Sequence, residues 1–332
     1  MVYDNKTRIK STVKAILFVG FVYGVIKILM LPQVNIINPF YQTIMLKIFI
    51  EITLALGLNL ITGITGQFSL GHAGFMSLGA YTAAFIMLRS SASLAMVVAA
   101  TLAGGIVAGL VGLLIGVPTL RLKGDYLAIA TLGLGEIIRI SLQTTSKGFL
   151  GGAAGLSSIP IFASFEGVFF VAVVCYFSIS NLMKSSYGRA LISVREDEIA
   201  SEAMGVNVTS MKMLAFIMGT FFAGIAGAMY AGYVGFIQPK DFGFMKSIEI
   251  LMIVVLGGLG NIRGTVIAAI VLNIIGVILQ DFSEIRMILY ALLLIIIMVL
   301  KSGETPWIQK LRATLNIRSF KFNVNGKNKA GV

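Results

Sequence analysis

Three polar side chains that could contact a solute stand together in an otherwise apolar part of this chain. They are Gln67, Ser69 and His72, and they fall within six residues. His72 is the only histidine among 332 residues. A single histidine nearly excludes catalytic triads that need a histidine base, and metal sites built from several histidines. The pattern therefore favours passage of a solute over a chemical reaction, and it implies neither a metal nor another cofactor.

The same stretch carries too many glycines for an unbroken helix, among them Gly63, Gly66, Gly71 and Gly74. Loosened backbone cannot face lipid, because each unpaired N–H or C=O group there costs several kcal/mol. We therefore expect the stretch to be buried in protein or to line a wet cavity, with plain close packing of helices as the alternative. A second break runs over residues 257–264. The residues predicted to form the translocation path or gate are Asn59, Gly66, Gln67, Ser69, Gly71, His72, Gly74, Gly257, Gly258 and Asn261.

Composition indicates a polytopic membrane protein of the all-α class. Hydrophobic residues make up 57% of the chain and charged residues only 12%, against about 25% charged in a soluble domain. The single cysteine, Cys175, lies in an apolar run, so no internal disulfide is expected. Apolar runs long enough to cross a bilayer recur along the chain, and they predict a transmembrane helical bundle of about ten spans with broken or re-entrant helices. The expected spans are 15–31, 44–62, 70–88, 94–117, 126–143, 167–183, 212–236, 247–260, 265–280 and 286–300.

The basic residues behind the formal net charge of +12 are distributed as in a membrane protein rather than a nucleic-acid-binding protein. Basic residues concentrate in the two tails and in alternate connections, as the positive-inside rule requires. This pattern excludes nucleic-acid binding and places both termini in the cytoplasm. It divides the chain into a basic N-terminal tail (1–14), a membrane domain (15–300, with a cytoplasmic loop at 184–211) and a basic, partly disordered C-terminal tail (301–332). Division of the spans into five and five would make an inverted repeat.

The cytoplasmic loop contains a short stretch built like a helix. Ser193 and Glu196 have the spacing of a capping box, and residues 196–198 place three acidic side chains in the first turn. Gly205 stands where a helix would stop. Isoleucine, alanine and methionine between these ends form a small apolar face, which suits a groove on a cytoplasmic partner. The alternative is a helix that rests on the membrane surface, and the acidic first turn argues against it.

Charged residues inside the expected spans are spaced so that they can pair. Glu136 and Arg139 are three residues apart, and Lys47 and Glu51 are four apart. Glu249 lies close to the end of a span. Ionisable groups within the membrane often have a functional role. Structural pairs that neutralise each other explain these charged residues equally well. Whether they are structural or functional is left open.

Several long motifs resemble those of the branched-chain amino-acid ABC transporter permeases, with the LivM-type subunit the nearer of the two permease types. Residues 55–63 run into Gly-Gln-Phe-Ser-Leu-Gly-His-Ala-Gly-Phe at 66–75, and further similar segments occupy 124–139, 187–205 and 256–265. The chain departs from the expected pattern at Glu51, where an uncharged residue would be typical, and in the external segment 151–155, which lacks a proline.

The resemblance implies an importer made of two related permease chains, two cytoplasmic ATPase subunits and an external substrate-binding protein, set in membrane lipid. It also implies that the cytoplasmic loop holds the helix that couples to the ATPase. The residues assigned to this coupling are Ser193, Arg195, Glu196, Asp197, Glu198, Ile199, Glu202, Ala203 and Gly205.

The function expected from the sequence is that of a non-enzymatic permease subunit in the cell membrane, passing branched-chain or related amino acids. ATP would bind another chain, because no phosphate-binding loop is present: Gly326-Lys327 is followed by Asn328. Three alternatives stay open. They are a permease for another small solute such as urea, a stand-alone secondary transporter or channel, and a structural membrane subunit without any path.

Overall fold

The computed structural model describes residues 39–90, 93–122, 124–146 and 150–279, together with five single residues outside these ranges. The chain divides into a unit of residues 1–278 and a unit of residues 279–332, and the description that follows concerns the first unit. The expected spans 15–31 and 286–300 and both tails lie outside the described ranges. A helix covers most of each of the eight expected spans between them. The single residues are Gly20, Tyr23, Gly24, Lys27 and Leu292.

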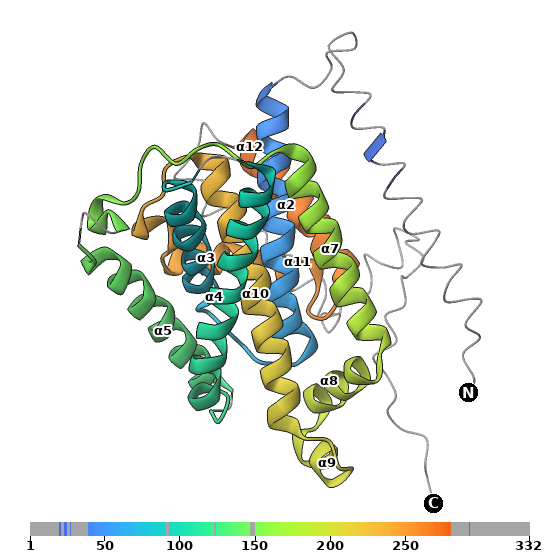
Figure 1. Ribbon diagram of the computed structural model, residues 1–332. Helices are drawn as coiled ribbons and strands as arrows, with labels where there is room; N and C mark the ends of the chain where they lie inside the picture. Colours follow the sequence, from blue (N-terminus) through green and yellow to red (C-terminus); the bar gives the residue numbers. More distant parts are fainter. Residues whose placement is uncertain are drawn as a thin grey trace, which may run out of the picture. The chain divides into compact units, whose positions relative to one another are not determined.

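Helices make up the described part of the chain, which contains no strand beyond one isolated bridge between Leu156 and Ile237. Figure 1 shows their arrangement. Four helices begin directly after a serine or asparagine whose side chain accepts a backbone N–H, so local capping sets their start. The elements are α2 (Pro39–Leu58), a π-helical turn (Asn59–Ile64), α3 (His72–Met87), α4 (Leu94–Thr119), α5 (Asp125–Thr144), a 3₁₀ turn (Gly152–Ala154), α7 (Phe165–Lys184), α8 (Ser186–Glu196), α9 (Glu198–Ala203), α10 (Val208–Val234), a 3₁₀ turn (Pro239–Phe242), α11 (Phe244–Gly257) and α12 (Ile262–Ile278).

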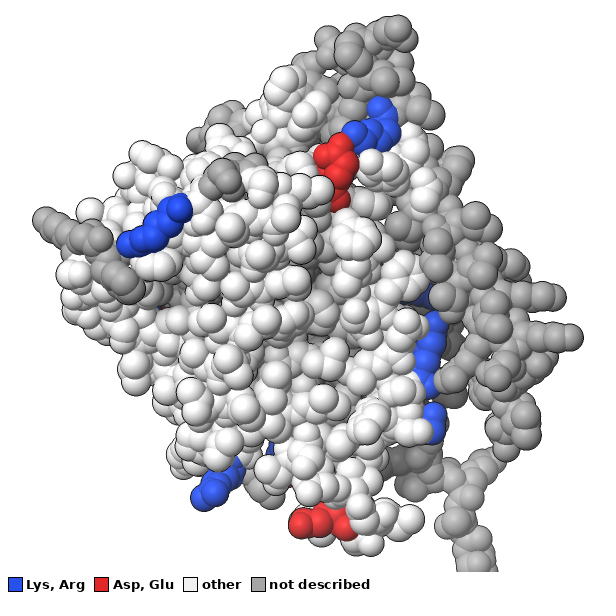
Figure 2. Space-filling model, viewed as in Figure 1, with Lys and Arg blue, Asp and Glu red and all other residues white. Residues whose placement is uncertain are grey.

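The outer helices present apolar side chains where a soluble protein would be polar. Along α4, Leu94, Leu110 and Leu114 are each more than half exposed, and α5 and α12 show the same pattern. Five of the described helices are long and apolar enough to cross a bilayer. Figure 2 shows that charged side chains lie at the margins of the visible face and leave a broad uncharged area between them. These features make the chain a multi-pass membrane protein.

The centre of the bundle is formed by α2, α3 and α10, which approach each other closely through glycine. A Cβ atom placed on Gly79 of α3 would lie 2.0 Å from the carbonyl oxygen of Gly224 on α10. On α4, a Cβ at Gly112 would lie 2.3 Å from Oγ1 of Thr220. Small residues at such crossings let helix backbones pack closely within a membrane.

The order of long and short helices repeats with inverted direction. The 26-residue helix Pro39–Ile64 is followed by a break and the shorter α3, and the 27-residue α10 is followed by a break and the shorter α11. α2 and α10 run in opposite directions (Figure 1), since the C-terminal end of α2 lies near the start of α10. α3 and α4 pack on α10, and α11 and α12 pack on α2 in the same way. The described helices therefore match three of the five pairs in the predicted inverted repeat.

Candidate functional site

The break after α2 and the π-helical turn is a stretch of irregular backbone at residues 65–71. Two of its N–H groups have partners outside the break: Gln67 N–H donates to the Ile61 carbonyl (3.1 Å), and Leu70 N–H donates to Thr131 Oγ1 (3.1 Å). One residue beyond the break's end, His72 Nε2 lies 3.2 Å from the Leu54 carbonyl. Leu54 precedes the end of the π-helical turn by about 15 Å of helix, so the irregular stretch returns into the bundle. The predicted burial of this segment is confirmed for Gln67, Ser69, Gly71 and His72 but not for Gly66 and Phe68.

Most of the predicted path residues in this break are buried. The side chains of Gln67, Ser69 and His72 are at most 2% exposed. Gly71 and Gly74 are buried as well, because their backbones press against α5 at Thr131 and Gly135. Gly66 differs: it is exposed, and its φ of +71° favours glycine. Phe68 is 38% exposed as well, so buried and exposed residues alternate along the break, and its polar side chains lie on the buried side.

Buried polar atoms without a hydrogen-bond partner concentrate in this same break. Among the residues that the structure describes, five such side-chain atoms occur, and four of them fall between residues 62 and 72. Burial of a polar group without a partner costs free energy, and such groups are usually satisfied by water or ligand. The concentration supports a polar passage through the break. The five atoms are Thr62 Oγ1, Gln67 Oε1, Ser69 Oγ, His72 Nδ1 and the Tyr81 hydroxyl.

The second break, predicted over residues 257–264, spans residues 258–261 in the structure and meets the π-helical turn that precedes the first break. Asn59 Nδ2 donates to Thr265 Oγ1 (3.0 Å), and Asn59 Oδ1 accepts from Gly260 N–H (2.8 Å). Arg195 of α8 joins them, since its Nη1 donates to the Gly63 carbonyl (3.0 Å). We call these five residues, Asn59, Gly63, Arg195, Gly260 and Thr265, the inner junction. It ties both breaks to the segment between α7 and α10.

The remaining predicted path residues shape the second break. Gly257 ends α11 against the backbone of Thr265, and Gly258 has a φ of +93°. Asn261 Oδ1 accepts the N–H of Gly264 (3.1 Å), which caps the start of α12. These three residues turn the chain between two helices and do not reach the buried polar atoms of the first break by any described hydrogen bond.

Replacement of Asn59 by leucine should destabilise the inner junction. Leucine has a similar size but leaves the partly buried Gly260 N–H without its partner, at a cost of about 1–3 kcal/mol. We expect a lower thermal midpoint for the purified N59L protein. Thr43→Val is the matched control, because the Thr43 hydroxyl bonds only to Pro39 within its own helix, at an exposed position. Equal midpoints for the two variants would contradict this role of Asn59.

The predicted coupling helix is two helices, and the predicted cap is wrong. Ser193 lies inside α8, where its Oγ donates to the Ala190 carbonyl (2.9 Å). Asp197 caps α9 instead, accepting Ala200 N–H at Oδ1 (3.0 Å). Glu196 pairs with Arg195 (2.6 Å) rather than reaching back to a cap. The stop at Gly205 is confirmed by its φ of +83°.

α9 presents an apolar face away from the rest of the described bundle. Ile199 is 77% exposed and Met204 is 84% exposed, and Glu202 and Ala203 beside them are exposed as well. At its start, α9 is held to α10 by an ion pair between Glu198 and Lys212. Lys212 also offers its backbone carbonyl to Gln67 Nε2 (3.1 Å), so the loop touches the first break a second time.

Charged residues at membrane depth pair as predicted, with one larger association that the sequence did not indicate. Arg139 Nε lies 2.7 Å from Glu136 Oε2, which confirms that pair. Lys47 is 4.0 Å from Glu51, but Glu51 has closer partners in Lys246 (3.2 Å) and Asn273 (2.6 Å). Lys246 lies in the first turn of α11, which begins beside α2, and this placement brings it to Glu51.

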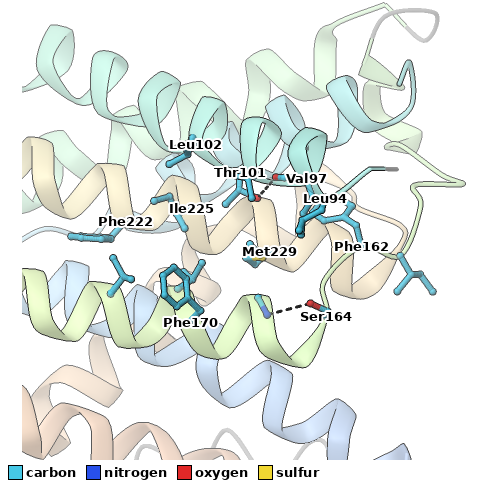
Figure 3. Close-up of a pocket in the computed structure, with 15 residues that line it drawn as sticks. Leu94, Val97, Thr101, Leu102, Phe162, Ser164, Phe170, Phe222, Ile225 and Met229 are labelled. Atoms are coloured by element: carbon cyan, nitrogen blue, oxygen red, sulfur yellow. Dashed lines mark hydrogen bonds between the residues drawn. The ribbon is translucent and has the colours of Figure 1, made fainter. Parts of the chain in front are cut away.

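A cavity of about 470 Å³ lies between α4, α7 and α10 (Figure 3). Its few polar groups bond within their own helices, as Thr101 does with the Val97 carbonyl (2.8 Å). Such an apolar lining does not suit a charged solute. The lining residues are Leu94, Val97, Val98, Thr101, Leu102, Ile161, Phe162, Ser164, Gly167, Phe170, Val171, Val174, Phe222, Ile225 and Met229.

Comparison with known proteins identifies relatives over most of the chain. A family described as the permease component of the branched-chain amino acid transport system matches residues 40–299. The permease LivM of high-affinity branched-chain amino acid transport is 36% identical over 284 residues in Salmonella typhimurium and in Escherichia coli, covering 75% of this chain and 66% of each relative. LivH of Salmonella typhimurium is 23% identical over 275 residues, covering 75% of this chain and 89% of that protein. The chain thus spans about two thirds of the length of its LivM relatives. No solved structure matches it.

Proposed function

Because this chain belongs to the family of branched-chain amino acid transport permeases, we propose that it is a permease subunit of an ABC importer for branched-chain or related amino acids. The observation that carries this proposal is the buried break at 65–71, with its unpartnered polar atoms beside His72. An amino acid with an apolar side chain needs dipolar partners of no strong net charge. The backbone groups of this break and the side chains of Gln67 and Ser69 supply such partners.

The partners that we propose are a sister permease, two cytoplasmic ATPase subunits and an external substrate-binding protein. The apolar face of α9 suits a groove on an ATPase, and the chain itself supplies no catalysis and no cofactor. ATP hydrolysis would tilt α8 and α9, and the inner junction would pass this movement to both breaks. Choice of substrate would rest mainly with the external protein.

We also propose that the end of the bundle bearing α8 and α9 faces the cytoplasm of the cell. α4 and α7 end on the same side (Figure 1), where Arg121 follows α4 and Lys184 is the last residue of α7. With Arg189 and Arg195 on α8, basic residues gather here as the positive-inside rule requires. Cytoplasmic termini follow from an even number of spans.

Uptake by the assembled transporter tests the proposed function. The complex, purified with its partner subunits and reconstituted in vesicles with the binding protein outside, should accumulate labelled leucine only when ATP is inside. Ion-driven uptake by this chain alone would favour a stand-alone transporter. Absence of uptake for any small solute would favour a structural subunit.

Charge reversal on α9 should uncouple transport. Glu198→Lys breaks the pair with Lys212, and Glu202→Lys alters the exposed face that we assign to the ATPase. Both variants should insert and assemble normally but lose ATP-driven uptake. Normal uptake in both would count heavily against α9 as the coupling element.

A further inference from the structure

A neutral group of four charged side chains and one amide joins α2, α11 and α12 inside the bundle. Lys246 lies 3.2 Å from Glu51 and 3.1 Å from Glu249. Asn273 donates to the second oxygen of Glu51 at 2.6 Å, and Lys47 stands 4.0 Å from the first. We call these five residues the α2–α11 charge cluster. Two lysines and two glutamates give it no net charge.

The cluster lies near the middle of the membrane. Glu51 is the thirteenth residue of the 26-residue helix Pro39–Ile64, so about 18 Å of helix separates it from either end. The hydrocarbon core of a bilayer is about 30 Å thick. Since Lys246 contacts Glu51, it shares this depth, and Glu249 follows one turn further inward along α11.

Exposure within the cluster is uneven. The side chains of Glu51 and Lys246 are 11% and 16% exposed, whereas that of Glu249 is 44% exposed. A carboxylate at this depth cannot face acyl chains without a cost of several kcal/mol, and the short glutamate side chain cannot reach the interface. The face that carries Glu249 is therefore turned to water or to another protein chain.

We infer that Lys246 and Glu249 bind the carboxylate and the ammonium group of the transported amino acid on this face, halfway across the membrane. An α-amino acid carries both charges on neighbouring groups, which complements an ammonium beside a carboxylate. Glu51 and Asn273 hold Lys246 in place when Glu249 turns to the solute. Because cluster and zwitterion are both neutral, binding exchanges one set of ion pairs for another and leaves no charge unpaired.

This inference rests on the proposed function and names a site for it that the break at 65–71 does not provide. The break supplies dipoles, whereas the cluster supplies the full charges that distinguish an amino acid from an uncharged solute such as urea. The face bearing Glu249 would then be the one that this chain turns to its sister permease.

Thiol labelling of the assembled transporter tests the location. The Glu249→Cys variant should react with a water-soluble thiol reagent, and saturating leucine should slow the reaction. The native Cys175 is fully buried and gives no background. Leu110→Cys, at a 56% exposed position on the lipid-facing side of α4, is the matched control and should stay unreactive. Lack of reaction of the E249C variant in every nucleotide state, or reaction that leucine does not slow, would overturn the inference.

Transport stoichiometry tests the role. Glu249→Gln should lower the leucine moved per ATP hydrolysed by about tenfold, which corresponds to about 1.4 kcal/mol, while the loaded binding protein still stimulates ATP hydrolysis. Glu249→Asp should recover much of the loss. Glu136→Gln alters another partly buried ion pair, on α5, and should change nothing. Wild-type stoichiometry in E249Q would refute the role. If the wild-type complex moves no amino acid, the proposed function fails, and the labelling of the E249C variant still decides whether this face is wet.

Discussion

Arg195→Ala is expected to abolish ATP-driven leucine uptake by the assembled transporter while ATP hydrolysis continues. Arg195 is the described side chain of α8 that bonds to the π-helical turn, through Nη1 and the Gly63 carbonyl. A hydrogen bond from a charged donor contributes about 1.5–3 kcal/mol, so its loss should lower the coupled rate at least about tenfold. Uptake and hydrolysis measured on the same vesicles give the ratio that checks this.

The position of Arg195 explains why the effect should fall on coupling rather than on folding. Its remaining nitrogens pair with Glu196 on the exposed surface, where ion pairs contribute little to stability. A Cβ on Gly66 or Gly260 would approach the Arg195 side chain to 3.0 Å or 2.9 Å, so the arginine touches both breaks at once. Movement of α8 would therefore shift both breaks together.

Arg189→Ala is the matched control. Arg189 lies on the same helix and is exposed, and its guanidinium bonds only to Ser186 within α8 among the described contacts. It should retain uptake and stoichiometry. Arg195→Lys, which keeps the charge but not the planar donor, should fall between the two. If R195A and R189A behave alike, the inner junction does not transmit the movement of α8.

The bundle and its breaks could be predicted because their causes are local. Apolar runs set the spans, and glycines in the run from Gly63 to Gly74 prevent a continuous helix. Gly205 stops the helix after α8 where expected. The cap was misplaced because Ser193 and Asp197 are both good caps, and the choice between them depends on where α8 ends. That end depends on contacts far along the chain, among them the bond from Arg195 to Gly63.

The α2–α11 charge cluster could not be predicted because its partners lie about two hundred positions apart. Lys246 stands just before the expected span 247–260, so its sequence context is that of a loop. Only the deep start of α11 places it beside Glu51. Two signals were present: Glu51 is charged where the family pattern is not, and Asn273 interrupts an apolar run. Neither of these two sequence signals identifies the partner residue without knowledge of the fold.

Gly79→Ala is expected to prevent correct packing of the bundle, although it adds a single methyl group. The new Cβ would lie 2.0 Å from the carbonyl oxygen of Gly224 and 2.4 Å from its Cα, and backbone atoms cannot turn aside as a flexible side chain can. α3 and α10 would have to separate at the centre of the protein, at a cost of about 3 kcal/mol or more. The yield of monodisperse protein in detergent and its thermal midpoint measure this loss.

Gly133→Ala separates this packing effect from the general effect of alanine in a helix. Gly133 lies within α5, and a Cβ there would meet nothing within 4 Å. Alanine has a higher helix propensity than glycine, so this variant should gain up to about 1 kcal/mol of stability. Its thermal midpoint should therefore be unchanged or higher. Both substitutions are identical in chemistry and differ only in what the methyl group meets. A loss at position 79 with none at 133 therefore measures the closeness of α3 and α10, whereas equal behaviour would mean that these helices do not cross at Gly79 and Gly224.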